Sequence, residues 1–181
     1  MRHIRLWAAL VAVVGAALVR PSIAGAQCTA NGIPASCNLP GSVSMTAGRV
    51  VRVQMSAGST ALTAPTPTEF DAGFNSTTGP AITVSANAAW TLHVRASAAL
   101  WTAVNTSPGA PARTTKPAAD LKWSTASDGT FTPLTTTDVT LVAGSATASS
   151  ATTLYFQTLY GWTLDTPGNY SLAVVLTLTS P

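Results

Sequence analysis

The sequence predicts an all-β protein: an antiparallel, two-sheet, immunoglobulin-like sandwich of about eight strands after a cleaved signal helix. Thr, Ser, Ala, Gly and Pro dominate the chain, and only 8% of its residues are charged. Beyond the first residues, no window shows apolar residues at the 3.6-residue spacing of a helix. Short alternating apolar runs recur instead between turn-forming residues, as in strands that cover a core on one side. A partly closed β-barrel is the alternative arrangement of these strands.

Residues 1–26 have the pattern of a secretory signal peptide. A basic start leads into an apolar run at 6–19, which is shorter than the roughly 20 residues of a bilayer-spanning helix. Small residues up to Ala26 precede Gln27, so cleavage is expected between these two. We therefore expect a single domain at 27–181 that is secreted or extracytoplasmic, in the periplasm or at the cell surface, with no membrane span after cleavage.

Loss of the signal changes the charge balance. The whole chain has nine basic and six acidic residues, and three of the basic ones, Arg2, Arg5 and Arg20, lie in the signal. Six basic residues then balance six acidic ones, and they form no cluster. A phosphate-binding surface needs a basic surplus, so the sequence predicts no nucleic-acid partner.

The two cysteines, Cys28 and Cys37, lie close together at the start of the predicted domain. In an oxidising compartment such a pair is expected to form a disulfide. On the loop-entropy model this bridge contributes about 2–3 kcal/mol to the free energy of unfolding. No second Cys or His pair has the spacing of a metal site, so no metal ion is expected.

Four strands are expected in the first half of the domain, each a short apolar run near turn residues: 42–45, 50–55, 82–86 and 90–96. In the second of these, Val51, Val53 and Met55 share one face. In the last, Trp90, Leu92 and Val94 alternate with polar residues, which predicts one buried and one solvated face.

Four more strands are expected in the second half, on the same criteria: 121–124, 139–142, 153–160 and 170–179. The last alternates over its whole length. It follows a turn in which Pro167 fixes φ and Gly168 supplies a positive φ. Two stretches between strands are expected to be long loops, 59–80 and the proline-rich 105–119, the latter as a mobile surface loop.

Catalytic residue patterns are missing from the sequence. The single histidine of the predicted domain, His93, is expected to be an exposed strand residue. Glu69 and Asp71 could lie near each other, but a pair of acids alone does not define a glycosidase. The chain has no nucleophile elbow, no phosphate-binding glycine loop and no calcium loop. We therefore expect a protein that is not an enzyme and has no cofactor.

The tryptophans of the predicted domain are expected mainly to pack in the core or at its rim. Trp90 lies on an apolar strand face, Trp123 lies in a short strand, and Trp162 precedes the last turn. Trp101 fits no expected element. The alternative is a platform that contacts a carbohydrate, and Trp101 and Trp162 are the candidates for such a glycan or cell-wall contact.

Two blocks of sequence resemble the WxL-type bacterial surface domains. Residues 82–94 (ITVSANAAWTLHV) are similar to the first W-x-L strand of that family, and 167–181 to its closing strand with a G-x-Y entry. Leu176 stands where the family has its second tryptophan, and the W-x-L at 162–164 precedes the turn. The resemblance implies a secreted β-sandwich displayed at the cell surface, in some members through non-covalent attachment to peptidoglycan.

Two functions follow as hypotheses. The first is a secreted or cell-surface, non-catalytic structural or binding module, with a cell-wall polymer or glycan as partner. The alternative is a subunit of a surface fibre or spore-coat-like assembly built by strand donation. Cleavage would leave only Gln27 ahead of Cys28, too little for a donor strand before the first cysteine. A fully paired final strand at 170–179 would also argue against that alternative.

Overall fold

The computed structural model describes residues 42–181. The predicted signal with its cleavage site at Ala26 and Gln27, and the predicted disulfide between Cys28 and Cys37, lie outside the described residues and remain predictions. Residues 47–181 form one compact unit, which is described here by itself.

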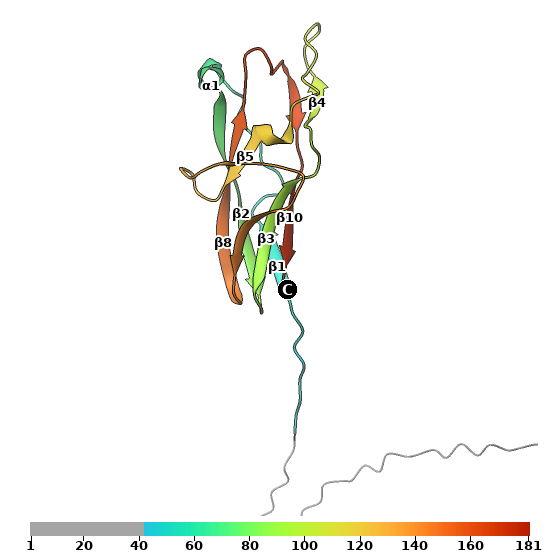
Figure 1. Cartoon of the computed structure of the whole chain (residues 1–181), viewed down its shortest axis with the longest axis vertical. Coiled ribbons are helices and arrows are strands. Elements are labelled where there is room, and N and C mark those ends of the chain that lie inside the picture. The colour runs from blue at the N-terminus through green and yellow to red at the C-terminus, as the bar shows by residue number, and fades with distance from the viewer. Residues whose placement is uncertain (1–41) are drawn as a thin grey trace, which may run out of the picture. The chain divides into compact units, whose positions relative to one another are not determined.

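This unit contains ten strands, one short α-helix and one 3-10 helix (Figure 1). In chain order they are β1 (Val51–Met55), α1 (Pro67–Ala72), β2 (Phe74–Ala86), β3 (Trp90–Ala96), β4 (Thr102–Asn105), η1 (Ala118–Asp120), β5 (Leu121–Ser124), β6 (Thr132–Pro133), β7 (Val139–Gly144), β8 (Thr147–Leu159), β9 (Gly168–Ser171) and β10 (Val174–Thr179). Every pairing between strands is antiparallel.

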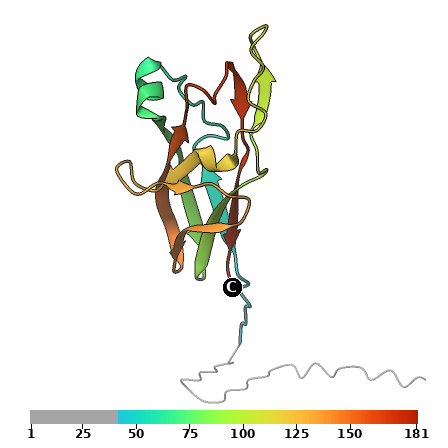
Figure 2. The same cartoon turned by 45° about the horizontal axis from the view of Figure 1, so that its top comes forward.

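The strands form two main sheets (Figure 2). Buried residues of both sheets belong to one hydrophobic core. The first sheet has the order β1-β2-β8-β5-β6 and the second the order β10-β3-β7, while β4 and β9 form a separate pair. The predicted all-β, two-sheet sandwich is therefore confirmed. The two main sheets of the described chain do not join into a closed barrel, so the alternative arrangement is not the one adopted.

The core follows from the alternation along β3. Trp90, Leu92 and Val94 are at most 3% exposed, while the residues between them are half-buried. Ile82 of β2 and Leu154 of β8 meet them from the other sheet, at 0% and 1% exposure. Complete burial of such a side chain contributes about 1.5–3 kcal/mol to folding, so alternation in a few strands accounts for much of the driving force.

Two long strands, β2 and β8, connect the sandwich to the segments that form the site: α1 precedes β2, and the turn with Trp162 follows β8. Each of these strands has 13 residues, and together they pair from Phe74–Leu159 to Ala86–Thr147. Their register shifts between Thr78 and Ala81. Gly79 lies in this bulge, where an added Cβ would be only 2.6 Å from the Phe156 ring. A glycine is needed here because the strand approaches an aromatic side chain so closely.

Strands were found at most expected positions, although β2 and β8 begin earlier than expected, at Phe74 and Thr147, and β4 and β6 were not expected. Two of the expected strands differ more. The expected strand at 42–45 is not formed, and Val43 and Met45 are fully or almost fully exposed, so no sheet buries them. The expected strand at 170–179 is interrupted at Leu172 and Ala173. Its first part, β9, pairs with β4 and its second part, β10, with β3, because the chain passes from one sheet to the other at the interruption.

The expected loop at 59–80 contains α1 and the start of β2. Thr66 and Glu69 form a capping box: the Glu69 carboxylate accepts hydrogen bonds from the backbone N–H of Thr66, at 2.7 Å, and from its hydroxyl. Pro67 starts the helix, and Gly73 ends it with φ 79°. These local signals, rather than any apolar periodicity, explain why so short a helix forms.

Candidate functional site: an aromatic cleft

A cleft of about 620 Å³ lies beside α1, the loop 62–65 and the turn that follows β8. Five aromatic side chains line it: Phe70, Trp101, Tyr160, Trp162 and Tyr170. Both tryptophans that the sequence singles out as glycan or wall candidates therefore border the same cleft. Phe70, Tyr160 and Tyr170 were not singled out from the sequence. Tyr160 and Tyr170 come from the same segment as Trp162, whereas Phe70 comes from α1, far away in the chain.

Trp162 is the exposed aromatic residue of this cleft. It remains 60% exposed, and its ring stacks on Phe70 of α1 with centroids 4.7 Å apart and planes tilted by 28°. Its indole N–H donates to the Asp71 carboxylate at 3.0 Å. The stacking and the hydrogen bond together fix the ring orientation while leaving most of its surface accessible.

Trp101 forms a buried part of the cleft wall. It is 5% exposed, and its indole N–H donates to the Pro117 carbonyl at 3.1 Å. Its backbone N–H donates to the Lys116 carbonyl at 2.9 Å. The expected core or rim packing thus describes Trp101 well, and it describes Trp90 and Trp123, which are 3% and 7% exposed.

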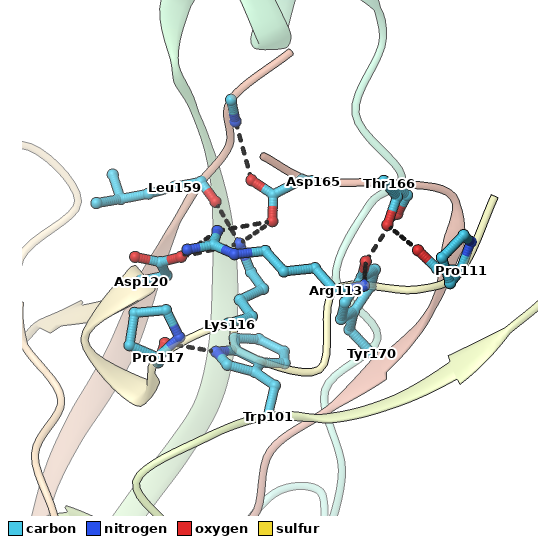
Figure 3. A network of polar contacts seen from close by, with 11 residues as sticks. Trp101, Pro111, Arg113, Lys116, Pro117, Asp120, Leu159, Asp165, Thr166 and Tyr170 are labelled. Atoms are coloured by element: carbon cyan, nitrogen blue, oxygen red, sulfur yellow. Dashed lines mark hydrogen bonds and ion pairs between the residues drawn. The ribbon is translucent and has the colours of Figure 1, made fainter. Parts of the chain in front are cut away.

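Four charged side chains form one ionic network at the wall of the cleft (Figure 3), and two of them, Lys116 and Asp165, line the cleft. The Lys116 ammonium donates to Asp165 Oδ1 at 2.8 Å, to Asp120 Oδ2 at 3.2 Å and to the Leu159 carbonyl at 2.8 Å. Arg113 Nη1 donates to the same two carboxylate oxygens, each at 3.2 Å. Two cations thus share two carboxylates, and all three donors of Lys116 have partners.

The network is largely shielded from solvent. The Lys116 side chain is 2% exposed and that of Asp165 is 7% exposed, while those of Arg113 and Asp120 are each 18% exposed. The expectation that 105–119 is a mobile surface loop is therefore wrong at its C-terminal end. A buried ammonium is stable only when it is paired and hydrogen-bonded, and the paired carboxylates hold this segment against the body of the protein.

Two tyrosines complete the polar part of the site. The Tyr170 hydroxyl accepts from the Arg113 backbone N–H at 2.9 Å and donates to the Thr166 carbonyl at 2.7 Å. Burial raises the pKa of the Tyr160 phenol above its ordinary value. A hydrogen bond with Thr158 opposes this shift, while the negative charge of Asp165 favours it.

The acidic pair and the histidine noted in the sequence have local roles in the structure. Glu69 caps α1, and its hydrogen bonds with Thr66 lower the pKa of its carboxyl group. Asp71 accepts from Trp162. His93 lies in a strand as expected, but it is half-buried rather than exposed. It lies in β3 opposite Thr177 of β10 and does not line this cleft.

A second opening of about 470 Å³ leads between the two main sheets. Its wall is mostly apolar and includes Met55 of β1, Leu154 of β8 and Leu176 of β10. Within the described chain, β10 pairs only with β3, so its other edge has no strand partner. This second site is called the edge slot below.

Neither a metal cluster nor a spanning helix is found in the part of the chain that the structure describes. No group of three His, Cys, Asp or Glu residues within 42–181 has the arrangement of a metal site. In the same residues, no helix combines the length and hydropathy needed to cross a bilayer.

A scan against models of protein families finds none that matches this chain, and a search of curated proteins finds no match either. The resemblance to the WxL-type domains remains a hypothesis. Its first block includes Trp90 and Leu92, which are core residues of β3, and its closing block spans β9 and β10. The fold and the cleft define the chain as a β-sandwich protein with an aromatic cleft supported by a buried ionic network.

Proposed function

We propose that this protein is a secreted or cell-surface, non-catalytic binding module whose cleft holds a saccharide unit of a cell-wall polymer or another glycan. The observation that carries the proposal is Trp162, an exposed ring held in one orientation at a cleft lined by further aromatic residues. The pattern of a secretory signal in residues 1–26 supports a location where such polymers occur.

The chemistry of the cleft suits a sugar. A pyranose ring presents apolar C–H faces that pack against indole and phenyl rings, and hydroxyls around its edge that need polar partners. Aromatic residues supply the first, and the polar side chains of Thr63, Thr166 and Asn169 also line the cleft and supply the second. A volume of about 620 Å³ lies within the range of about 300–1,000 Å³ that small-molecule sites occupy.

The scaffold favours binding without large rearrangement. The turn that carries Trp162 is closed by hydrogen bonds between Gly161 and Asp165: the Asp165 backbone N–H donates to the Gly161 carbonyl at 2.9 Å. The Gly161 N–H donates back to Asp165 Oδ2, also at 2.9 Å. A site whose side chains are fixed before binding loses less conformational entropy when the ligand arrives.

Co-sedimentation tests the proposal. The exported protein is incubated with purified peptidoglycan sacculi, and in parallel with insoluble chitin and cellulose, and the pellet is analysed after centrifugation. We expect the protein to pellet with at least one polymer and Trp162→Ala to lose this at least about tenfold, the equivalent of about 1.4 kcal/mol. Protein that stays in the supernatant with all three polymers would contradict the proposal.

Leu164→Ala is the matched control. Leu164 lies in the same turn and is 59% exposed, close to the value for Trp162, but it does not line the cleft. This variant is expected to pellet like the native protein. An equal loss in both variants would mean that the turn, rather than the aromatic ring, decides binding.

A specific observation favours a second candidate function, a subunit of a surface fibre or spore-coat-like assembly. The free edge of β10 lies beside the apolar edge slot, which is the arrangement that accepts a strand from another chain. Light scattering over a range of concentrations tests it. Oligomers that Leu176→Lys abolishes would support strand exchange between copies, and a monomer at every concentration would contradict it.

A further inference from the structure

We propose that Lys116 and Asp165 are the site of an intramolecular isopeptide bond, formed between the Lys116 amine and the Asp165 side-chain carboxyl. This inference concerns covalent modification of the chain and does not depend on the proposed binding function. The observation behind it is a nearly inaccessible lysine 2.8 Å from a nearly inaccessible carboxylate, with a second carboxylate 3.2 Å from the lysine (Figure 3).

The geometry places the reacting atoms together. Lys116 Nζ contacts Asp165 Oδ1, and the other oxygen, Oδ2, accepts a hydrogen bond from the Gly161 N–H at 2.9 Å. This hydrogen bond holds the carboxyl group in place and polarises it. Fixing an amine against a carboxyl carbon in a site that is largely shielded from water gives the pair a high effective concentration, which ordinary solution chemistry lacks.

Asp120 is the group that moves the protons. Its Oδ2 lies 3.2 Å from Lys116 Nζ, so it accepts a proton from the ammonium and frees the nitrogen lone pair. The amine then bonds to Cγ of Asp165, and the bond from Cγ to Oδ1 breaks. Oδ1 leaves as water with two protons, one returned by Asp120 and one from the amine nitrogen. Asp120 ends as the carboxylate that it was at the start, and no oxidant or other reactant is needed.

The charge balance of the network favours this product. Before the reaction, two cations and two carboxylates share a poorly solvated site, where desolvation opposes every charge. The condensation removes one positive and one negative charge together. Arg113 and Asp120 remain as a single pair, 3.2 Å apart. Lys116 and Asp165 both line the aromatic cleft, which gives the released water a path to solvent.

Peptide mass spectrometry of the full, natively folded chain tests the bond. Trypsin cuts after Arg113 and after Lys122 but not after Lys116, because Pro117 follows it. Digestion therefore separates 114–122 from 123–181 unless a side-chain bond joins them. We expect one branched species with the summed mass of both peptides less one water. Two separate peptides with unmodified masses would overturn the proposal.

Variants keep the test independent of folding. Lys116→Arg retains a cation but has no nucleophilic amine, and it is expected to release both peptides. Asp165→Asn retains the shape and is expected to form the same amide with loss of ammonia in place of water. Lys122→Arg preserves the tryptic site and should leave the branched species unchanged.

Asp120→Asn tests the proton transfer separately, because it removes the group that accepts the proton while keeping its size. A time course after refolding is expected to show slower formation of the branched species than in the native protein. Formation at an unchanged rate would overturn the role of Asp120.

Discussion

Trp162 stacks on Phe70, which connects the turn after β8 to the short helix α1. The two residues lie far apart in the sequence, and neither is part of the sandwich core. The exposed ring that the proposed binding depends on is therefore held by a six-residue helix. Anything that weakens the start of that helix should also loosen the cleft.

The capping box of α1 gives a pH-dependent prediction. The pKa of Glu69 is lowered in the folded state, so its contribution to stability is present above its unfolded value, near 4.5, and is lost as pH falls through the folded value. We expect amide exchange in 67–72 to accelerate relative to the core over this acidic range. Glu69→Gln should remove the pH dependence, and equal acceleration in that variant would contradict the prediction.

Tyr160 gives a prediction at the opposite end of the pH scale. Its pKa is raised from 10.0 by burial, so its contribution to stability is present below 10.0 and is lost as pH rises through the folded value. Phenolate absorbance during an alkaline titration should show a late step. Tyr160→Phe should remove this step, and a native protein without it would contradict the assignment.

Close packing of Trp90 against Gly144 predicts a costly substitution. An added Cβ at Gly144 would be 2.8 Å from the Trp90 ring, whose indole N–H donates to the Ser145 carbonyl at 2.8 Å. Gly144→Ala should lower the free energy of unfolding by about 1–3 kcal/mol, measured by urea denaturation. Gly58→Ala is the control, since nothing lies within 4 Å of its Cβ position. Equal urea midpoints for the two variants would show that the tryptophan ring moves freely.

Removal of one member of the ionic network should cost more than removal of a balanced pair. Lys116→Met leaves two buried carboxylates with one cation, and it should lower the free energy of unfolding by about 3–5 kcal/mol. Lys116→Met with Asp165→Leu should recover part of this loss, because Arg113 and Asp120 still balance. Denaturation of both variants and of Lys122→Met, a partly exposed control, tests this. A double variant no more stable than the single one would contradict it.

The sequence was sufficient to predict the sandwich because alternation follows burial in central strands such as β3. In β1 it does not, since Val51, Val53 and Met55 remain 36%, 38% and 48% exposed. β3 and β5 were expected at 90–96 and 121–124, where the structure has them. Local alternation does not show which strand is the partner, so the division of 170–179 between two sheets could not be seen. That division depends on where β3 and β4 lie, which is a property of the whole fold.

The candidate site was predicted only in part. Trp101 and Trp162 stand out in the sequence because neither lies on the apolar face of an expected strand, and both line the cleft. The ionic network was not predicted, since Lys116 lies in a segment rich in proline and small residues that looks solvated. In a chain with so few charged residues, the grouping of Arg113, Lys116 and Asp120 in one short segment was the available signal.

The ionic network also determines what kind of recognition the cleft can offer. Lys116 and Asp165 satisfy one another and their neighbours, so the charges at the cleft are directed inward and neutralised before any ligand arrives. A bound saccharide would meet ring faces, hydroxyls and amides. Attraction between exposed charges is screened within about 10 Å at 0.1 M salt. Stacking on aromatic rings and hydrogen bonds to hydroxyls and amides are not screened in this way. Retention on a polymer should consequently persist at ionic strengths that release proteins held by surface charge.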